Sequence, residues 1–384
     1  MGVQHWETVD YGREIRFNVR ANTPTEIVVA RLTVFAEHLA APHVVDIPVA
    51  GGRQVELAQR VSVAELALPA FARFHAQWDF IDAANTRYTS DPFPVTYMDN
   101  AVPWEWVAAS DGGVTVYTAG GDALTAEAAL DLAGAALAGA RRTLAVSGPP
   151  EISIVVYPEL SQLAHSLRLH GENVQDWIAA YAIPAYDVAL VAAAPGHDLV
   201  ANLQRDIPHE VTHLVLDEAV GDRVASLPGW LSEGLALTSA PEPDPTLRRV
   251  LLEAVGGGGL LPLEALCAPR FTGLSPQHTA LAYAQSESVM RYVSGRFGPS
   301  QVQALISAYA GGAECETGVR RALGLSLAEL ETQWHNDLLS QASRAAQDEG
   351  SLVPWLIAWL VSLGLALLFV APQPQRRVTG GRAP

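Results

Sequence analysis

The stretch DIPHEVTHLVL, residues 206–216, places two histidines four positions apart, with a glutamate directly after the first. On a helix, residues four apart lie on the same face, so His209 and His213 can direct an imidazole nitrogen at one point. Two neutral imidazoles are good zinc ligands, and Glu210 would stand beside the metal, where it can accept a proton from a zinc-activated water. The alternative is a pair of surface or core histidines that bind no metal.

A catalytic zinc takes three protein ligands and leaves a fourth position open. The best candidate for the third ligand is Glu233 in PGWLSEGLA, twenty residues after His213 and on the next expected helix. The intervening segment contains Gly221, Pro228 and Gly229, which favour a reversal of the chain. An antiparallel helix after this loop would bring the carboxylate back beside the two histidines.

Pro208 directly precedes the first histidine. A proline inside a helix costs about 3 kcal/mol, but in the first turn its missing N–H has no partner to lose. With Asp206 as N-cap, the helix is expected to begin here rather than at Leu199. We therefore predict a break or kink near 206–208.

Residues 12 to about 100 are expected to form short strands separated by turns. REIRFNV and FARFHAQWDFI alternate apolar and polar residues, and Gly51 and Gly52 stand between two alternating runs in VDIPVAGGRQVEL, which predicts a hairpin. This spacing indicates an antiparallel β-sandwich of immunoglobulin or fibronectin type over residues 1–110.

The pattern changes from about residue 113. VTVYT, EISIVVYP and DVALVAA are expected strands, and DALTAEAALDLAGAALAGARRTL is an expected helix. Beyond residue 198 the apolar spacing is helical almost to the end. Strands followed by helices predict a multidomain protein whose second domain, residues 111–345, is α+β.

HEVTH followed by GWLSEG resembles the gluzincin metallopeptidases, which combine HExxH with a downstream glutamate ligand, and especially their peptidase MA-like bacterial branch. LAYAQSESVMRYVSGRFG and LSLAELETQWHNDL are similar to later helices of that family, so the resemblance covers about 113–340. It implies Zn²⁺ bound by His209, His213 and Glu233, Glu210 as general base, and a peptide or protein substrate.

A gluzincin usually adds a tyrosine or histidine that stabilises the developing oxyanion. Tyr283 in AYAQS is our candidate for this role, and the alternative is a tyrosine that packs on an amphipathic helix. The GxMEN motif of the aminopeptidase branch is absent from the sequence. We therefore expect an endopeptidase. A catalytically silent surface binding or scaffold protein, with the sandwich recognising a partner, is the competing function.

The segment SLVPWLIAWLVSLGLALLFVAP, 351–372, carries no charge across its apolar run. About 20 such residues at about 1.5 Å each span a hydrocarbon core of about 30 Å. We predict a transmembrane helix over 352–371 and a tail over 372–384. A buried core helix is the alternative.

Three arginines follow this segment and two acidic residues precede it, so the positive-inside rule places the tail in the cytoplasm and residues 1–350 outside. MGVQHWETVDYGREIRF shows neither the basic nor the apolar region of a signal peptide. Either the start of the gene is missing, which the charge rule favours, or the protein is tail-anchored with its bulk in the cytoplasm.

The net charge of −17 argues against a nucleic-acid partner, because phosphate binding needs a basic patch. The two cysteines, Cys267 and Cys315, form no CxxC pair, which excludes a cysteine-based zinc site. They could bridge each other in an oxidising compartment, or remain two unlinked buried thiols.

Overall fold

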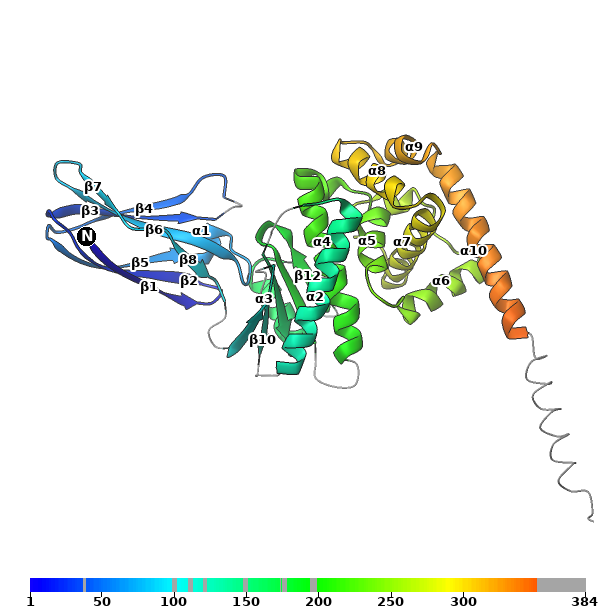
Figure 1. The fold of residues 1–384 in the computed structure, drawn as a ribbon, viewed down its shortest axis with the longest axis horizontal. Coiled ribbons are helices and arrows are strands. Elements are labelled where there is room, and N and C mark those ends of the chain that lie inside the picture. The colour runs from blue at the N-terminus through cyan, green and yellow to red at the C-terminus, as the bar shows by residue number, and fades with distance from the viewer. Residues whose placement is uncertain are drawn as a thin grey trace, which may run out of the picture. The chain divides into compact units, whose positions relative to one another are not determined.

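The computed structural model describes residues 1–36, 39–98, 102–109, 113–119, 123–147, 151–172, 174, 178–193 and 199–350 (Figure 1). The chain divides into two compact units, Met1–Leu330 and Glu331–Pro384. The predicted transmembrane helix, 352–371, and the predicted tail, 372–384, lie outside the described residues. The predicted domain boundaries stay predictions.

Two antiparallel sheets form the N-terminal part. The first has the strand order β1-β2-β5, and the second has the order β4-β3-β6-β7, with β8 also paired to β6. Their bounds are β1 Gly2–Asp10, β2 Glu14–Asn22, β3 Ile27–Phe35, β4 His43–Pro48, β5 Gln54–Ser62, β6 Arg73–Asp82, β7 Arg87–Thr89 and β8 Phe93–Thr96, with a short helix α1 at Val63–Leu66.

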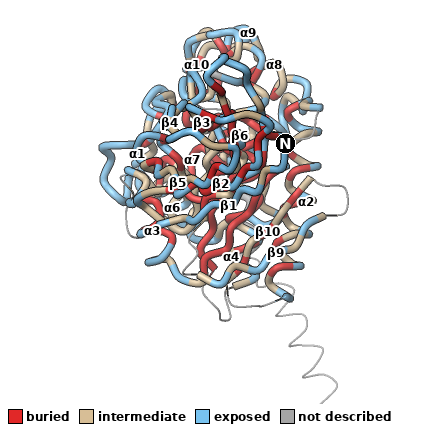
Figure 2. Tube along the Cα trace, turned by 90° about the vertical axis from the view of Figure 1, so that its left-hand side faces the viewer, coloured by how far each residue is buried: buried red, intermediate tan, exposed pale blue. Residues whose placement is uncertain are grey.

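The two sheets share one apolar core. The predicted apolar face of β6 is confirmed, since Phe74, Ala76, Trp78 and Phe80 are all buried, and Phe17 of β2 meets Phe74 edge-on with ring centroids 6.5 Å apart. Buried residues are red in Figure 2, and they run through these strands. Antiparallel sheets are therefore present as predicted, while the immunoglobulin or fibronectin type stays a prediction.

The predicted hairpin at Gly51 and Gly52 is wrong. The strands on either side of it belong to different sheets, because β4 pairs with β3 and β5 pairs with β2. The loop is instead held by the connection between β2 and β3: the carbonyl of Gly52 accepts from the N–H of Ile27, and that of Arg53 accepts from the N–H of Thr23. Two glycines between alternating runs indicate a turn but not which strand each run will pair with.

A third sheet follows, with the strand order β12-β13-β11-β10-β9. The strands β10, β11 and β13 are parallel, and β9 and β12 are antiparallel strands at the two edges. The bounds are β9 Trp104–Ala108, β10 Val114–Ala119, β11 Ile152–Tyr157, β12 Ala180–Ile183 and β13 Val188–Ala192, with helices α2 Ala123–Leu144, α3 Leu160–Leu169 and η1 Pro184–Tyr186.

The two faces of this sheet are covered differently. Val188 and Leu190 of β13 join the apolar core shared with the N-terminal sheets, as does Leu167 of α3. Because side chains alternate along a strand, the neighbouring residues of β13 face the other side, where α2 and α4 cover the sheet. We call these sides the α3 face and the α4 face.

Helices make up the rest of the described chain, as the apolar spacing predicts, so the protein combines mixed sheets with helices. Their bounds are α4 Leu199–Val220, η2 Gly221–Ser226, α5 Gly229–Thr238, α6 Pro245–Gly257, η3 Ala265–Cys267, α7 Pro276–Phe297, α8 Pro299–Ala310, α9 Cys315–Leu323 and α10 Leu327–Gly350.

The predicted break near 206–208 is wrong, because α4 runs through Pro208 without interruption. Asp206 is therefore not an N-cap but a buried helical residue, paired with Arg205 at 2.6 and 2.9 Å. Proline costs the helix one backbone hydrogen bond. Extensive burial of the surrounding residues, from Leu203 to Leu216, offsets that cost.

Within the described residues, α2 is long and apolar enough to cross a membrane by length and composition alone. The helix nevertheless packs against α4 and β10, and Ala129, Ala133 and Leu137 are buried on this side. Core helices pass the same test of length and composition, so α2 is no evidence for a membrane span.

Candidate metal centre

Helix α4 presents His209 and His213 on one face, one turn apart. Their Nε2 atoms lie 3.2 Å from each other, and their rings meet edge-on with centroids 4.8 Å apart. The side chains are 18% and 20% exposed. Both imidazoles therefore point at one partly accessible place, as the four-residue spacing predicts.

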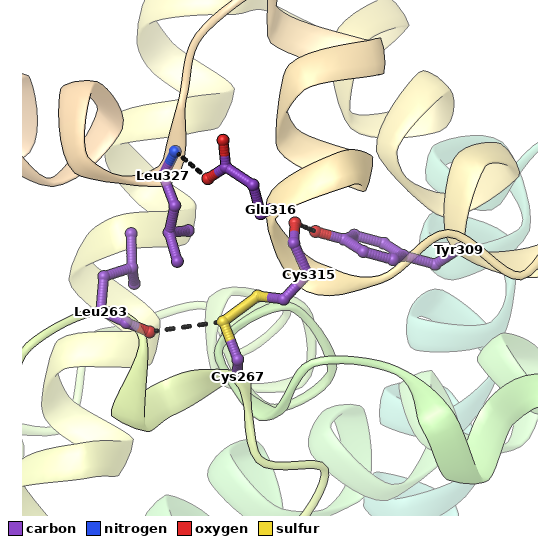
Figure 3. The surroundings of a disulfide bond; sticks show 6 residues. All are labelled: Leu263, Cys267, Tyr309, Cys315, Glu316 and Leu327. Carbon is purple, nitrogen blue, oxygen red and sulfur yellow. Dashed lines mark hydrogen bonds between the residues drawn. A yellow bond between two sulfur atoms is a disulfide. The ribbon is translucent and has the colours of Figure 1, made fainter.

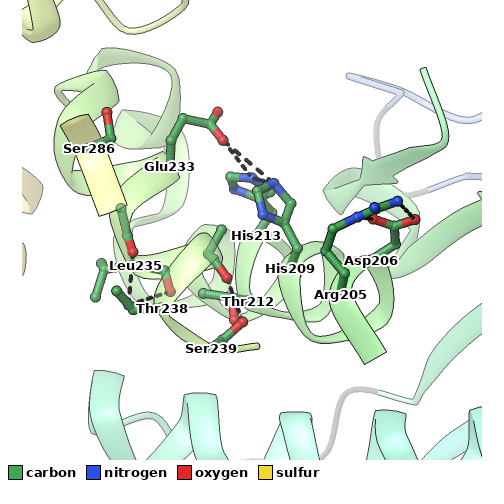
Figure 4. A network of polar contacts seen from close by, with 12 residues as sticks. Arg205, Asp206, His209, Thr212, His213, Glu233, Leu235, Thr238, Ser239 and Ser286 are labelled. Atoms are coloured by element: carbon green, nitrogen blue, oxygen red, sulfur yellow. Dashed lines mark hydrogen bonds and ion pairs between the residues drawn. The ribbon is translucent and has the colours of Figure 1, made fainter. Parts of the chain in front are cut away.

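Helix α5 brings the third predicted side chain to the same place. Oε2 of Glu233 lies 3.5 Å from Nε2 of His209 and 3.6 Å from Nε2 of His213 (Figure 4). Ligands about 2.0–2.1 Å from a tetrahedral zinc lie about 3.3–3.4 Å apart, close to all three separations. Two imidazoles and one carboxylate also form a known catalytic zinc set. These three residues thus form a His-His-Glu cluster that can hold a metal ion.

The reversal between α4 and α5 follows from local sequence. Gly221 begins η2 in the left-handed region with φ +63, a conformation that glycine adopts without steric cost. Pro228 precedes the first residue of α5, and the N–H of Gly229 donates to the carbonyl of Ala268 at 3.1 Å. The loop predicted from these glycines and this proline therefore orients the helix that carries Glu233.

Two glycines of the motif GWLSEG allow α5 to approach its neighbours closely. A Cβ on Gly234 would lie 2.5 Å from the carbonyl oxygen of Ser286 on α7, and one on Gly229 would lie 2.5 Å from the carbonyl oxygen of Ala268. Neither distance is possible for a real Cβ, so only glycine permits this packing. Gly234 is next to Glu233 and hence fixes the depth at which the carboxylate sits.

Glu210 lies beside the cluster on α4 and is 6% exposed. Burial raises the pKa of its carboxyl group, although the neighbouring histidines oppose this shift. A carboxylate with a raised pKa accepts and releases a proton closer to neutral pH than an exposed glutamate does.

Opposite charges hold the three other side chains together. Burial disfavours the charged form of His213, but the Glu233 carboxylate outweighs burial and raises the pKa of His213 to about 9. Burial likewise disfavours the Glu233 carboxylate, yet the two histidines hold its pKa well below the usual range. The Glu233 carboxylate thus attracts positive charge to this place, and a metal ion would displace the proton of His213, because histidine binds zinc as the neutral imidazole.

Tyr283 lies on α7 and is partly buried. Burial raises the pKa of its hydroxyl, and the charges of Glu233 and Glu210 raise it further. Helix α7 packs against α5, which carries Glu233. The ring also meets Phe271 edge-on at 5.5 Å. The structure therefore brings Tyr283 near the cluster, while its role toward an oxyanion stays a prediction.

Sequence reasoning missed the edge strand β12 and its Tyr181. Burial raises the pKa of this tyrosine to about 12, and both Glu172 and Glu210 contribute to the shift. The strand β12 packs against α4, the helix that carries His209 and His213. Four residues, AYAI, of which two are alanines, are too few to give a clear strand signal by themselves.

A disulfide joins Cys267 of η3 to Cys315, the first residue of α9 (Figure 3). The Tyr309 hydroxyl donates to the carbonyl of Cys315 at 2.9 Å. Of the two alternatives drawn from the sequence, the structure shows the bridged one. It secures the segment 267–271, which contacts the start of α5 and the Tyr283 ring.

Comparison with known proteins gives a family match over more than half of the chain. The family model described as Peptidase MA superfamily matches residues 132–340. A search of curated proteins finds no match.

Several solved structures are similar to this chain at low identity. An M1 zinc metallopeptidase from Deinococcus radiodurans is 13% identical with a TM-score of 0.34, over 84% of this chain and 88% of that one. An aminopeptidase N family protein from Idiomarina loihiensis is 9% identical with a TM-score of 0.38, over 89% and 76%. OgpA from Akkermansia muciniphila is 11% identical with a TM-score of 0.20, over 25% of this chain and 29% of OgpA.

Proposed function

Because this chain belongs to the peptidase MA superfamily, we propose that it is a zinc-dependent peptidase that hydrolyses peptide bonds in a peptide or protein substrate. The observation that carries this proposal is the convergence of His209, His213 and Glu233 at separations that suit a tetrahedral zinc, with a buried Glu210 beside them. The net charge of −17 supports no nucleic-acid role.

His209, His213 and Glu233 would hold the zinc ion. When bound, zinc supplies Lewis acidity toward a carbonyl oxygen and toward water. Glu210 would accept the proton of the attacking water and deliver it to the leaving amine, which suits its raised pKa. Tyr283 would donate its hydroxyl to the developing oxyanion, a role that the packing of α7 against α5 supports.

The strand β12 offers a place for the substrate backbone. Among the described strands only β13 pairs with it, so no described strand covers its other edge. An extended peptide can add to such an edge as a further strand. The strand β12 packs against α4, the helix that carries the proposed general base Glu210.

We further propose endopeptidase activity, on the basis that the sequence lacks the GxMEN motif. Mass spectra of the products distinguish the two modes, because an endopeptidase yields internal fragments and an aminopeptidase removes single residues in order.

We also propose that residues 352–371 anchor the protein in the cell membrane, with the bulk of the chain outside and the tail in the cytoplasm. The support is the uncharged apolar run and the arginines after it. The disulfide between Cys267 and Cys315 adds support, because disulfides persist in oxidising compartments.

The direct test of peptidase activity is Glu210→Gln in the full chain, assayed on a peptide library. We expect cleavage by the wild type and a loss of at least about 100-fold in the variant, since a general base contributes about 10²–10⁴. Glu218→Gln is a matched control, because Glu218 is exposed on the same helix, and it should cleave normally. Equal activity of Glu210→Gln and wild type would contradict the proposed role, and a zinc-loaded wild type that cleaves nothing would favour the silent binding protein.

A further inference from the structure

A cavity of about 240 Å³ lies between the N-terminal sheets and the third sheet. Its walls come from Ala67, Pro69 and Ala70 in the segment after α1, from Leu167 and His170 at the end of α3, and from Ile183 of β12. Pockets that enclose whole small-molecule ligands measure about 300–1,000 Å³. This cavity is smaller, so its size suits one side chain rather than a separate ligand.

The cavity is placed to receive a side chain from a peptide on the edge of β12. Tyr181 and Ile183 pair with Leu190 and Val188 of β13, so they lie on the α3 face. A strand added to β12 would direct alternate side chains to this face, while the intervening ones would point toward α4 and the His-His-Glu cluster. One substrate residue near the cleaved bond would thus point toward Ile183 and into the cavity.

The charge of the cavity comes from Glu172, which lines it. Oε2 of this glutamate accepts from the Tyr181 hydroxyl at 2.8 Å. Among the described residues its hydrogen-bond donor is therefore a neutral hydroxyl rather than a cation. Glu172 is exposed, so its carboxylate can also meet a cation that enters from solvent. Arg270 acts on the same Tyr181 hydroxyl and lowers its pKa.

His170 does not supply a compensating positive charge. Its Nδ1 lies 2.6 Å from the carbonyl of Ser166, so this nitrogen carries the proton and donates, and Nε2 is left to accept from the Tyr97 hydroxyl at 3.1 Å. Burial also lowers the pKa of this histidine. The imidazole is thus neutral with both nitrogens engaged.

We propose that this cavity is a specificity pocket for a lysine or arginine side chain of the substrate. The apolar walls would pack against the methylene groups, and Glu172 would pair with the charged end. An acidic side chain would be repelled by Glu172. This inference rests on the proposed peptidase function, and it makes the N-terminal sheets part of the substrate site through Ala67, Pro69 and Ala70.

The test uses sets of three peptides that differ at one position, which carries lysine, its uncharged analogue norleucine, or alanine. Each set varies a different position near the cleaved bond. We expect the full-length wild type to prefer lysine over norleucine at one position by about fivefold in kcat/KM, as suits a partly exposed ion pair. Glu172→Gln should equalise the two. No preference in the wild type, or a lysine preference that survives Glu172→Gln, would overturn the pocket.

Two further variants separate the pocket from a general charge effect. Glu159→Gln removes an exposed carboxylate at the other end of α3, and it should keep the lysine preference. Ala185 is exposed and lines the cavity, so Ala185→Trp should fill it and slow cleavage of the lysine and norleucine peptides but not of the alanine peptide. If Ala185→Trp slows all three equally, the cavity does not receive this side chain.

Binding distinguishes failure of the pocket from failure of the peptidase function. If the wild type cleaves no peptide, lysine and norleucine peptides are titrated calorimetrically into full-length Glu210→Gln. Tighter binding of lysine that is lost on adding Glu172→Gln would support the pocket without the peptidase, and equal binding of both peptides would overturn it.

Discussion

Gly234 shows how one residue without a side chain sets the position of a functional one. A Cβ at this position would lie 2.5 Å from the Ser286 carbonyl oxygen and 2.7 Å from Cβ of Met290. Gly234→Ala should therefore push α5 away from α7, cost about 1–3 kcal/mol in unfolding free energy, and displace Glu233. We expect zinc affinity to fall by about 10- to 100-fold, the range seen when ligand positioning is disturbed.

Zinc titration and thermal unfolding of the variant check this expectation. The control is Gly295→Ala, because Gly295 lies on α7 but a Cβ added there would meet no atom within 4 Å, and it should leave zinc affinity unchanged. If Gly234→Ala binds zinc as tightly as the wild type, the close packing of α5 on α7 does not position the Glu233 carboxylate.

At the scale of residues, the sequence predicts the His-His-Glu cluster well and its surroundings poorly. His209 and His213 share a helical turn, so their convergence is local geometry. Glu233 reaches the histidines only if the chain reverses direction once between the two helices, and Gly221 and Pro228 indicate that reversal in the sequence. Tyr181 comes near the cluster only through the pairing of β12 with β13, and no local pattern encodes that pairing.

Elements were predicted where periodicity is strong and missed where tertiary contacts decide. Helix α2 and strands β10, β11 and β13 follow from their apolar patterns, whereas the exposed strand β1 has no apolar face to reveal it. The predicted hairpin at Gly51 is wrong because the pairing of a strand depends on contacts throughout the sheet, not on the turn beside it. The helix break at Pro208 failed because burial of α4 outweighs the propensity of one residue.

The disulfide links two elements, η3 and α9, and it thereby fixes the segment that contacts the start of α5. Cys267 adjoins Ala268, whose carbonyl accepts from Gly229 at the start of α5. Replacing both cysteines by serine should lower the unfolding free energy by about 2–4 kcal/mol and weaken zinc binding. Calorimetric unfolding with and without a reductant checks this, and a wild type that unfolds identically under both conditions would contradict it.

For the whole molecule, the membrane anchor is the prediction with the widest consequence. If 352–371 spans the bilayer, the full chain should remain in carbonate-washed membranes, and a chain truncated after residue 350 should be released. Protease added to intact cells should digest the part before residue 350. A full chain found in the soluble fraction would contradict the anchor, and protection from protease would favour the tail-anchored alternative.

The central claim is that one zinc ion is held by two imidazoles and the Glu233 carboxylate. The most direct measurement is metal analysis with zinc X-ray absorption on the full-length Glu210→Gln protein. The account predicts about one zinc per chain with two nitrogen ligands at about 2.0–2.1 Å, and loss of that zinc in Glu233→Ala. A protein without zinc, or one whose zinc keeps the same ligands in Glu233→Ala, would contradict it.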